Sequence, residues 1–185
     1  MITATDGTVA GDHPAEGAGT QDASVLAVGD RAPEFSLPDD RGVEVSLSSV
    51  LHTGSLLLYF YPADFTPGCT REACGIAEYY PALSDQGIRV IGVSPQRPDS
   101  HQRFRERYQL PFPLLCDADK TVIRMYEVDG PLGIGVRRAT YLIDPARIVR
   151  GALLADLRIE RHLEFIRQAH ALLQQPGVGT MWPTG

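Results

Sequence analysis

The sequence predicts an α/β domain in which a central mixed β-sheet is flanked by helices and preceded by an N-terminal β-hairpin. Three observations support this prediction. Short continuous apolar runs, such as residues 56–61 and 89–94, are typical of strands buried on both faces of a sheet. Segments with helical spacing of apolar residues lie between and after these runs, as in layered α/β folds. A turn sequence at residues 39–42 separates two stretches in which apolar and polar residues alternate.

The first expected element is the hairpin. Apolar side chains alternate with polar ones over residues 35–37 and again over residues 43–47. Between them, residues 39–42 combine two aspartates, an arginine and a glycine, a composition typical of a tight turn. We therefore expect two antiparallel strands at the start of the folded domain.

Four further strands are expected downstream. Residues 56–61 and 89–94 are the first two, and residues 140–144 make a third apolar run. Residues 148–154 would form the fourth, after a turn at residues 144–145. Because helices separate most of these strands, the sheet is expected to have a mostly parallel core, to which the hairpin adds an antiparallel portion.

Four helices fit between and after these strands. One follows Cys69, and Pro81 is expected to kink it or restart it one turn later. Asp99 with Gln102 resembles a capping box that opens a second helix. Asp119 is a candidate cap for a short third helix. The fourth helix carries its apolar face at Ile159, Leu163, Ile166 and Leu173.

Composition points to one globular domain. The 185 residues include 43% hydrophobic and 22% charged residues, which is enough to build a sizeable core. We expect the folded domain at residues 27–175, with flexible tails at residues 1–26 and 176–185, the latter containing the single tryptophan, Trp182. A net charge of −6 gives no basic surface for a nucleic-acid partner or an anionic membrane.

The compartment is inferred from what the chain lacks. The N-terminus has no basic and apolar regions of a signal peptide, and no apolar run approaches the roughly 20 residues of a membrane span. Three cysteines are too few, and odd in number, for the disulfide scaffold of a secreted domain. We therefore expect a cytoplasmic protein, in which a close cysteine pair indicates redox chemistry or metal binding.

The segment between the strand at 56–61 and the following helix carries the chemistry. Thr66 suits the N-cap of that helix, and Pro67 suits its first position, where a missing N–H is tolerated. This register places Cys69 in the first helical turn. Free backbone N–H groups and the helix dipole there favour a thiolate, and the Thr66 hydroxyl is close enough in sequence to donate a hydrogen bond to the sulfur.

The spacing of Cys69 and Cys74 predicts two conformations. In an intact α-helix, residues five apart have Cα atoms on the order of 8 to 9 Å apart, and their side chains point in different directions. Disulfides rarely form beyond about 7 Å between Cα atoms. A bond between these cysteines therefore requires the first helical turns to unwind, and the flanking Gly68 and Gly75 lower the cost of unwinding.

Two simpler interpretations compete with this one. A cysteine at a helix start is often only a small buried apolar residue. A C-x4-C pair also suggests zinc, but a structural zinc site needs four ligands, and Cys116 with five scattered histidines supplies no second paired motif. We therefore expect no metal and no cofactor.

The same segment resembles a known family. Pro62, Thr66 and Cys69 match the peroxiredoxin signature Pro-x3-Thr-x2-Cys, and residues 60–75, FYPADFTPGCTREACG, resemble the peroxiredoxin Q or bacterioferritin comigratory protein subfamily. The similarity extends from about residue 28 to residue 173. It implies a thioredoxin-like fold and a thiol peroxidase that reduces hydrogen peroxide or organic hydroperoxides.

The resemblance also implies roles for individual residues. Cys69 would be the peroxidatic cysteine, and Cys74 the resolving cysteine that forms a disulfide with it. Thr66 would orient the peroxide and Pro62 would shield the sulfur from water. The family has an arginine before a late strand, in the pattern Arg-x-Thr-Phe-Leu-Ile-Asp, which residues 138–144 match, so Arg138 would stabilise the thiolate. The adjacent Arg137 leaves a misassignment by one residue open.

The implied partners are a hydroperoxide substrate and thioredoxin or a similar dithiol reductant, in a monomer or homodimer. Cys116 stands where the family usually has a small residue, so it is either a buried spectator or an alternative resolving thiol.

Three other functions were compared with the peroxidase interpretation. A disulfide reductase usually carries C-x-x-C, which this chain lacks, whereas a peroxide sensor with little turnover would share the first chemical step. An inactive structural protein is disfavoured because Thr66, Cys69 and Arg138 are all present.

Overall fold

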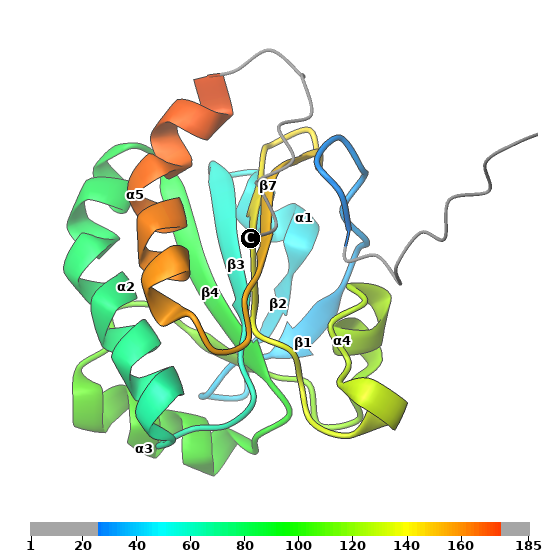
Figure 1. The fold of residues 1–185 in the computed structure, drawn as a ribbon. Helices are drawn as coiled ribbons and strands as arrows, with labels where there is room; N and C mark the ends of the chain where they lie inside the picture. Colours follow the sequence, from blue (N-terminus) through cyan, green and yellow to red (C-terminus); the bar gives the residue numbers. More distant parts are fainter. Residues whose placement is uncertain (1–25, 175–185) are drawn as a thin grey trace, which may run out of the picture.

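A computed structural model of the chain describes residues 26–174. The predicted tails lie outside the described residues, apart from Leu26, and so does Trp182. Within the described range the predicted class is confirmed: a central mixed sheet lies between two layers of helices, with a hairpin at the N-terminal side (Figure 1).

The central sheet has five strands in the order β5-β4-β3-β6-β7. Strands β5, β4 and β3 are parallel to one another, whereas β6 is antiparallel to β3 and β7 is antiparallel to β6. The sheet is therefore mixed, as predicted, but only two of its four strand pairings are parallel. The strands are β3 (Ser55–Phe60), β4 (Ile88–Ser94), β5 (Leu114–Cys116), β6 (Ala139–Ile143) and β7 (Val149–Leu154).

The N-terminal hairpin consists of β1 (Ser36–Pro38) and β2 (Glu44–Ser46), which pair antiparallel as predicted. Leu47 was expected to continue the second strand, but it begins the short helix α1 (Leu47–Leu51). The reason is local. The Ser46 hydroxyl accepts a hydrogen bond from the backbone N–H of Ser49 at 3.2 Å, which caps a helix at that point.

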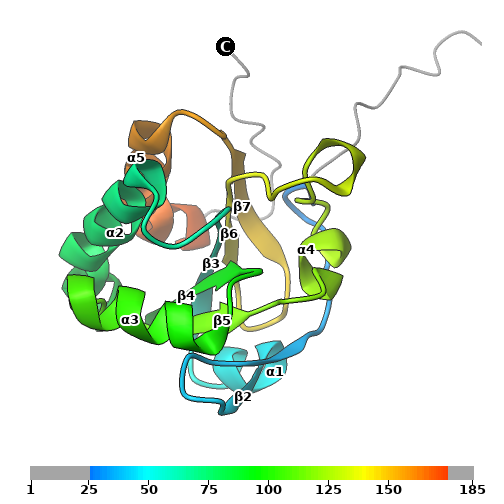
Figure 2. The ribbon, with the colours of Figure 1, turned by 90° about the horizontal axis from the view of Figure 1, so that it is seen from below.

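The helices cover both faces of the sheet. Those on one face are α2 (Pro67–Asp85), α3 (Pro98–Tyr108) and α5 (Ile159–Gln174), and the other face carries α1, α4 (Thr121–Met125) and the hairpin. Figure 2 shows this division. A short 3-10 turn, η1 (Pro131–Gly133), precedes β6. The apolar side chains on each face of the sheet pack against the helices that cover that face. The sheet therefore separates two hydrophobic cores and contributes side chains to both.

Two predictions of helix boundaries are wrong. Helix α3 begins at Pro98 after Arg97, so Asp99 and Gln102 lie inside it and form no capping box. Helix α4 has Lys120 as its N-cap, although the Asp119 carboxylate still accepts a hydrogen bond from the Thr121 N–H at 3.0 Å. Helix α2 continues through Pro81 to Asp85 without a restart.

Strand β5 was not predicted. It has only three residues and follows Pro111 and Pro113, which read as a loop in the sequence. It is nevertheless fully buried, and the Gly92 N–H of β4 donates to the carbonyl of Pro113 at 3.2 Å. Among the described residues, no helix combines the length and apolar character needed to cross a membrane.

Close packing at Gly92 gives a test of this fold. A Cβ atom there would lie 2.6 Å from Cζ of Tyr59 and 2.8 Å from Cδ2 of Leu114. Tyr59 cannot move away easily, because it is buried and stacks on Tyr61 with ring centroids 5.4 Å apart. We expect Gly92→Ala to lower the free energy of unfolding by about 1–3 kcal/mol, measured by urea denaturation.

Tyr59→Phe is the matched control at the same contact. The Tyr59 hydroxyl is buried and has no hydrogen-bond partner, so its removal should be neutral or should stabilise by about 1 kcal/mol. A Gly92→Ala protein as stable as the wild type would contradict the packing described here.

Candidate active site

Cys69 lies where the sequence places it, in the first turn of α2. Thr66 is the N-cap residue in extended backbone geometry, and Pro67 occupies the first helical turn. The helix starts beside the carboxyl end of β3, the edge of a parallel sheet where ligand sites usually form. Cys69 is 1% exposed, so its sulfur lies among unpaired helix N–H groups with little bulk water around it.

Arg138 contacts this sulfur. Its Nη2 atom donates to Cys69 Sγ at 3.3 Å, and the arginine is almost completely buried. The residue immediately precedes β6, which pairs antiparallel with β3, so the sheet brings the guanidinium to the start of α2. Arg137 is the more exposed of the two arginines and contacts Asp156 at 3.4 Å. The geometry therefore selects Arg138 over Arg137.

Sequence reasoning missed Glu72, which forms a buried ion pair with Arg138. Its side chain is completely buried. Burial raises the pKa of Glu72 to about 7, although the Arg138 charge acts in the opposite direction. A signal was present in the sequence. Glu72 lies three residues after Cys69 and shares a helical face with Ala73 and Ile76, so a charged residue stands on an otherwise apolar face.

His162 of α5 completes the buried group. Burial lowers the pKa of His162 to about 4, so the ring is neutral near pH 7. In that state Nε2–H donates to the carbonyl of Ala155 at 3.0 Å, and Nδ1 accepts from the Thr140 hydroxyl at 2.8 Å. Because the ring carries no charge, Arg138 is the cation that faces both Glu72 and Cys69.

The backbone around Arg138 is also fixed. The Arg138 N–H donates to the Asp156 carboxylate at 2.8 Å, and the guanidinium Nε donates to the Asp156 carbonyl at 3.4 Å. Gly68 contributes by its small size, because a Cβ atom there would lie 3.3 Å from Nη2 of Arg138. These contacts hold the guanidinium at the sulfur without side-chain crowding.

Thr66 differs from its prediction. Its hydroxyl donates to the carbonyl of Ala63 at 3.2 Å instead of to Cys69, and the residue is exposed. Pro62 is partly buried just after β3. The structure therefore places both residues on the loop that leads to Cys69, and their roles toward a peroxide stay predictions.

Cys74 lies on the same unbroken helix as Cys69, and both thiols are free. Burial and the nearby Glu78 raise the pKa of Cys74, so its thiol is protonated at neutral pH. The adjacent Gly75 has a second role besides flexibility. A Cβ atom there would lie 2.5 Å from Cδ2 of Leu163, so the glycine permits close packing of α2 on α5.

Cys116 ends β5, where it is 6% exposed. Burial, with a contribution from the Asp40 charge, raises the pKa of Cys116 to about 12. A thiol with that pKa has almost no thiolate at neutral pH and reacts slowly. This supports the spectator interpretation of Cys116.

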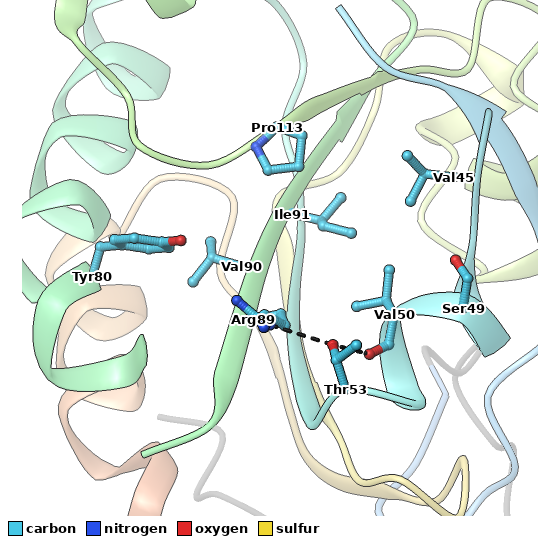
Figure 3. A pocket seen from close by; sticks show the side chains of 9 residues that line it. All are labelled: Val45, Ser49, Val50, Thr53, Tyr80, Arg89, Val90, Ile91 and Pro113. Carbon is cyan, nitrogen blue, oxygen red and sulfur yellow. Dashed lines mark hydrogen bonds between the residues drawn. The ribbon is translucent and has the colours of Figure 1, made fainter. Parts of the chain in front are cut away.

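No group of three or more His, Cys, Asp or Glu side chains suited to a metal ion occurs within residues 26–174. A pocket of about 300 Å³ opens near the start of β4, with Tyr80 on one side and Val45 and Val50 on the other (Figure 3). None of the residues predicted to act on peroxide lines it.

Known proteins share this sequence and fold. The AhpC/TSA family model matches residues 28–152. A peroxiredoxin bcp of Coxiella burnetii is 40% identical over 144 residues, which are 75% of this chain and 94% of that protein. The crystal structure of peroxidoxin BcpB from Mycobacterium tuberculosis has a TM-score of 0.75 and 31% identity, over 81% of this chain and 99% of that one. Peroxiredoxin Q of Xanthomonas campestris gives a TM-score of 0.68 and 28% identity, over 75% and 89%.

These similarities confirm the predicted thioredoxin-like fold and the resemblance to peroxiredoxins of the bacterioferritin comigratory and Q types. They cover the strands and helices that carry Cys69 and Arg138. The chain therefore belongs to the AhpC/TSA family, and within it to the peroxiredoxins.

Proposed function

We propose that Cys69 and Cys74 carry the thiol-dependent peroxidase activity of this chain. The contact between Arg138 Nη2 and Cys69 Sγ, at 3.3 Å in a buried site, is the observation that supports this most directly. A positive charge and a helix N-terminus at the sulfur both favour the thiolate, which is the nucleophile in peroxide reduction.

In the first step, the Cys69 thiolate attacks the terminal oxygen of a hydroperoxide. An S–O bond forms and the O–O bond breaks, so Cys69 is oxidised to a sulfenic acid and the other oxygen leaves as water or an alcohol after taking up a proton. Negative charge moves from sulfur toward the departing oxygen during this step. Arg138 lies close enough to stabilise it throughout.

In the second step, the Cys74 thiol condenses with the Cys69 sulfenic acid and releases water. The two residues share the continuous helix α2, so its first turns must unwind before the sulfur atoms meet. The reduced helix is therefore the form that reacts with peroxide, and the unwound segment is the form that makes the disulfide.

In the third step, a dithiol protein such as thioredoxin reduces the disulfide by exchange and is itself oxidised. The cycle uses no metal or organic cofactor. Hydrogen peroxide and organic hydroperoxides are the proposed substrates, and a cytoplasmic location and a monomer or homodimer stay predictions from the sequence.

Turnover with cysteine variants tests the two-cysteine cycle. With thioredoxin, thioredoxin reductase and a nicotinamide electron source, the wild type should consume many equivalents of peroxide. Cys69→Ser should be inactive, and Cys74→Ser should stop as a sulfenic acid, detected by intact mass. Cys116→Ser is the control and should behave as the wild type. An intramolecular disulfide in Cys74→Ser would make Cys116 the resolving residue, and a wild type that stops after one equivalent would indicate a sensor.

Arg138→Gln tests the contact that favours the thiolate. Loss of a positioned charge at the reacting atoms should lower the second-order rate constant with hydrogen peroxide by about 100-fold or more. The matched control is Arg137→Gln, since that neighbouring arginine contacts Asp156 and not the sulfur. The rate constants are measured by competition for peroxide. If both variants lose reactivity equally, the contact between Arg138 and the sulfur is not what accelerates the reaction.

Glu72→Gln tests whether the ion pair with Glu72 weakens the stabilisation of the Cys69 thiolate by Arg138. The ionised carboxylate opposes formation of a thiolate at the same guanidinium, so the variant should react faster with peroxide than the wild type above about pH 7, where Glu72 is ionised, and the two pH–rate profiles should converge at lower pH. Superimposable profiles for variant and wild type would contradict this coupling.

The raised pKa of Glu72 also predicts how stability depends on pH. The unfolded chain releases the Glu72 proton near the ordinary value of 4.5, whereas the folded chain keeps it to about 7. The unfolded state therefore binds fewer protons between these values, and the Glu72 contribution to stability falls as pH rises from 4.5 to 7. Urea denaturation at several pH values should show this fall in the wild type and its absence in Glu72→Gln.

A further inference from the structure

A second buried pair of ionisable side chains lies beside the active site, and the proposed chemistry does not use it. Asp64 stands in the loop between β3 and α2, and His101 stands in α3. Nδ1 of His101 lies 3.0 Å from both carboxylate oxygens of Asp64. The two side chains are 0% and 1% exposed, so the pair is shielded from water.

Both nitrogens of the His101 ring face acceptors. Nδ1 faces Asp64, and Nε2 lies 3.2 Å from the carbonyl oxygen of Leu115, with the Ser94 hydroxyl 3.5 Å away. The His101 ring is therefore held at both nitrogens, between the Asp64 carboxylate and the backbone of β5.

Asp64 has further donors around it. The Tyr61 hydroxyl donates to its carboxylate at 2.8 Å and the Ser100 hydroxyl at 2.6 Å. Burial alone would raise the pKa of Asp64, but the hydrogen bonds and the charge of its partners hold the pKa below its ordinary value. The carboxylate is thus fixed from three sides, by the end of β3 and by two consecutive residues of α3.

Phe65, the residue after Asp64, also packs against α3. Phe65 has a positive φ of 61°, a conformation that is unfavourable for a bulky side chain. Its ring lies on Phe104 of α3, with centroids 5.1 Å apart, and near Tyr108, at 6.3 Å. Asp64 and Phe65 together attach the loop to α3 directly before the start of α2.

This attachment bears on the unwinding that the disulfide requires. A chain segment that unwinds gains backbone conformational entropy with every released residue. Because Asp64 and Phe65 are held by α3, release stops at the helix start and does not extend back to Pro62. Fewer released residues make the unwound state less favourable, and the folded helix with Cys69 at Arg138 is favoured accordingly.

We propose that the Asp64–His101 pair is a positioning device that sets the balance between the folded helix, which reacts with peroxide, and the unwound segment, which holds the Cys69–Cys74 disulfide. This inference rests on the proposed two-cysteine cycle. It predicts that loss of the pair favours the disulfide over the two thiols, although neither residue touches a sulfur atom.

The test is a redox equilibrium of the full chain with oxidised and reduced dithiothreitol, read as the disulfide fraction by alkylation and mass. In Asp64→Asn the shape is kept and the charge is lost. The equilibrium constant for the Cys69–Cys74 disulfide should rise about tenfold, which is a reduction potential about 30 mV more negative. His101→Gln should give a similar shift, and the double variant should add little, because the two residues act as one unit.

Asp40→Asn is the matched control. Asp40 is also buried, and it pairs with Arg105 of the same helix α3 at 3.1 Å, but it joins α3 to the hairpin instead of to the active-site loop. The same substitution there should leave the equilibrium within about twofold of the wild type. Ser100→Ala removes one neutral donor without leaving a buried charge unpaired, so it should fold and shift the equilibrium in the same direction by a smaller factor.

An unchanged potential in both Asp64→Asn and Ser100→Ala would overturn the inference, and so would an equal shift in Asp40→Asn. The measurement uses no peroxide, so the two proposals fail separately. A wild type that forms the disulfide with dithiothreitol but consumes no peroxide would refute the proposed function alone. A potential insensitive to Asp64 in an active peroxidase would refute the positioning role alone.

Discussion

The arrangement of this site depends on one buried guanidinium that contacts both a sulfur atom and a carboxyl group. Arg138 contacts the Cys69 sulfur and forms an ion pair with Glu72, which lies one helical turn away. A cation in this place needs an opposite charge because burial is costly, yet a strong permanent partner would weaken its effect on the thiolate. The high pKa of Glu72 resolves this conflict, since a carboxyl that ionises near neutral pH is a weak competitor.

Helix α2 has to satisfy two opposite requirements. In the proposed cycle it must be intact to place Cys69 at its N-terminus, and its first turns must open for Cys74 to reach the sulfur. Different contacts hold the two ends of this helix. The loop before the helix is attached to α3 at Asp64 and Phe65, whereas Gly75 lets the later part of α2 pack closely on α5. In our proposal the opening is thereby confined to the segment that holds the two cysteines.

The sequence predicted the parts of the molecule that depend on local patterns. Continuous apolar runs identified β3 and β4, and the Thr66–Pro67 start placed Cys69 correctly. Side chains that meet through the fold were harder to predict. Asp64 and His101 lie 37 residues apart in the sequence, and no sequence pattern connects them. Strand β5 was missed for another reason: its prolines suggest a loop, and only pairing with β4 makes it a strand.

The different surroundings of the two cysteines decide which sulfur a reductant attacks. Thiol–disulfide exchange is faster at the more accessible sulfur and when the departing thiolate is the better stabilised one. Cys74 is partly exposed, whereas Cys69 is buried beside Arg138 and the helix N-terminus. In the proposed cycle, attack on Cys74 would release the Cys69 thiolate toward the partners that surround it once the helix has re-formed. The mixed disulfide with the reductant would then form on Cys74, and Cys69 would be the first thiol to be regenerated.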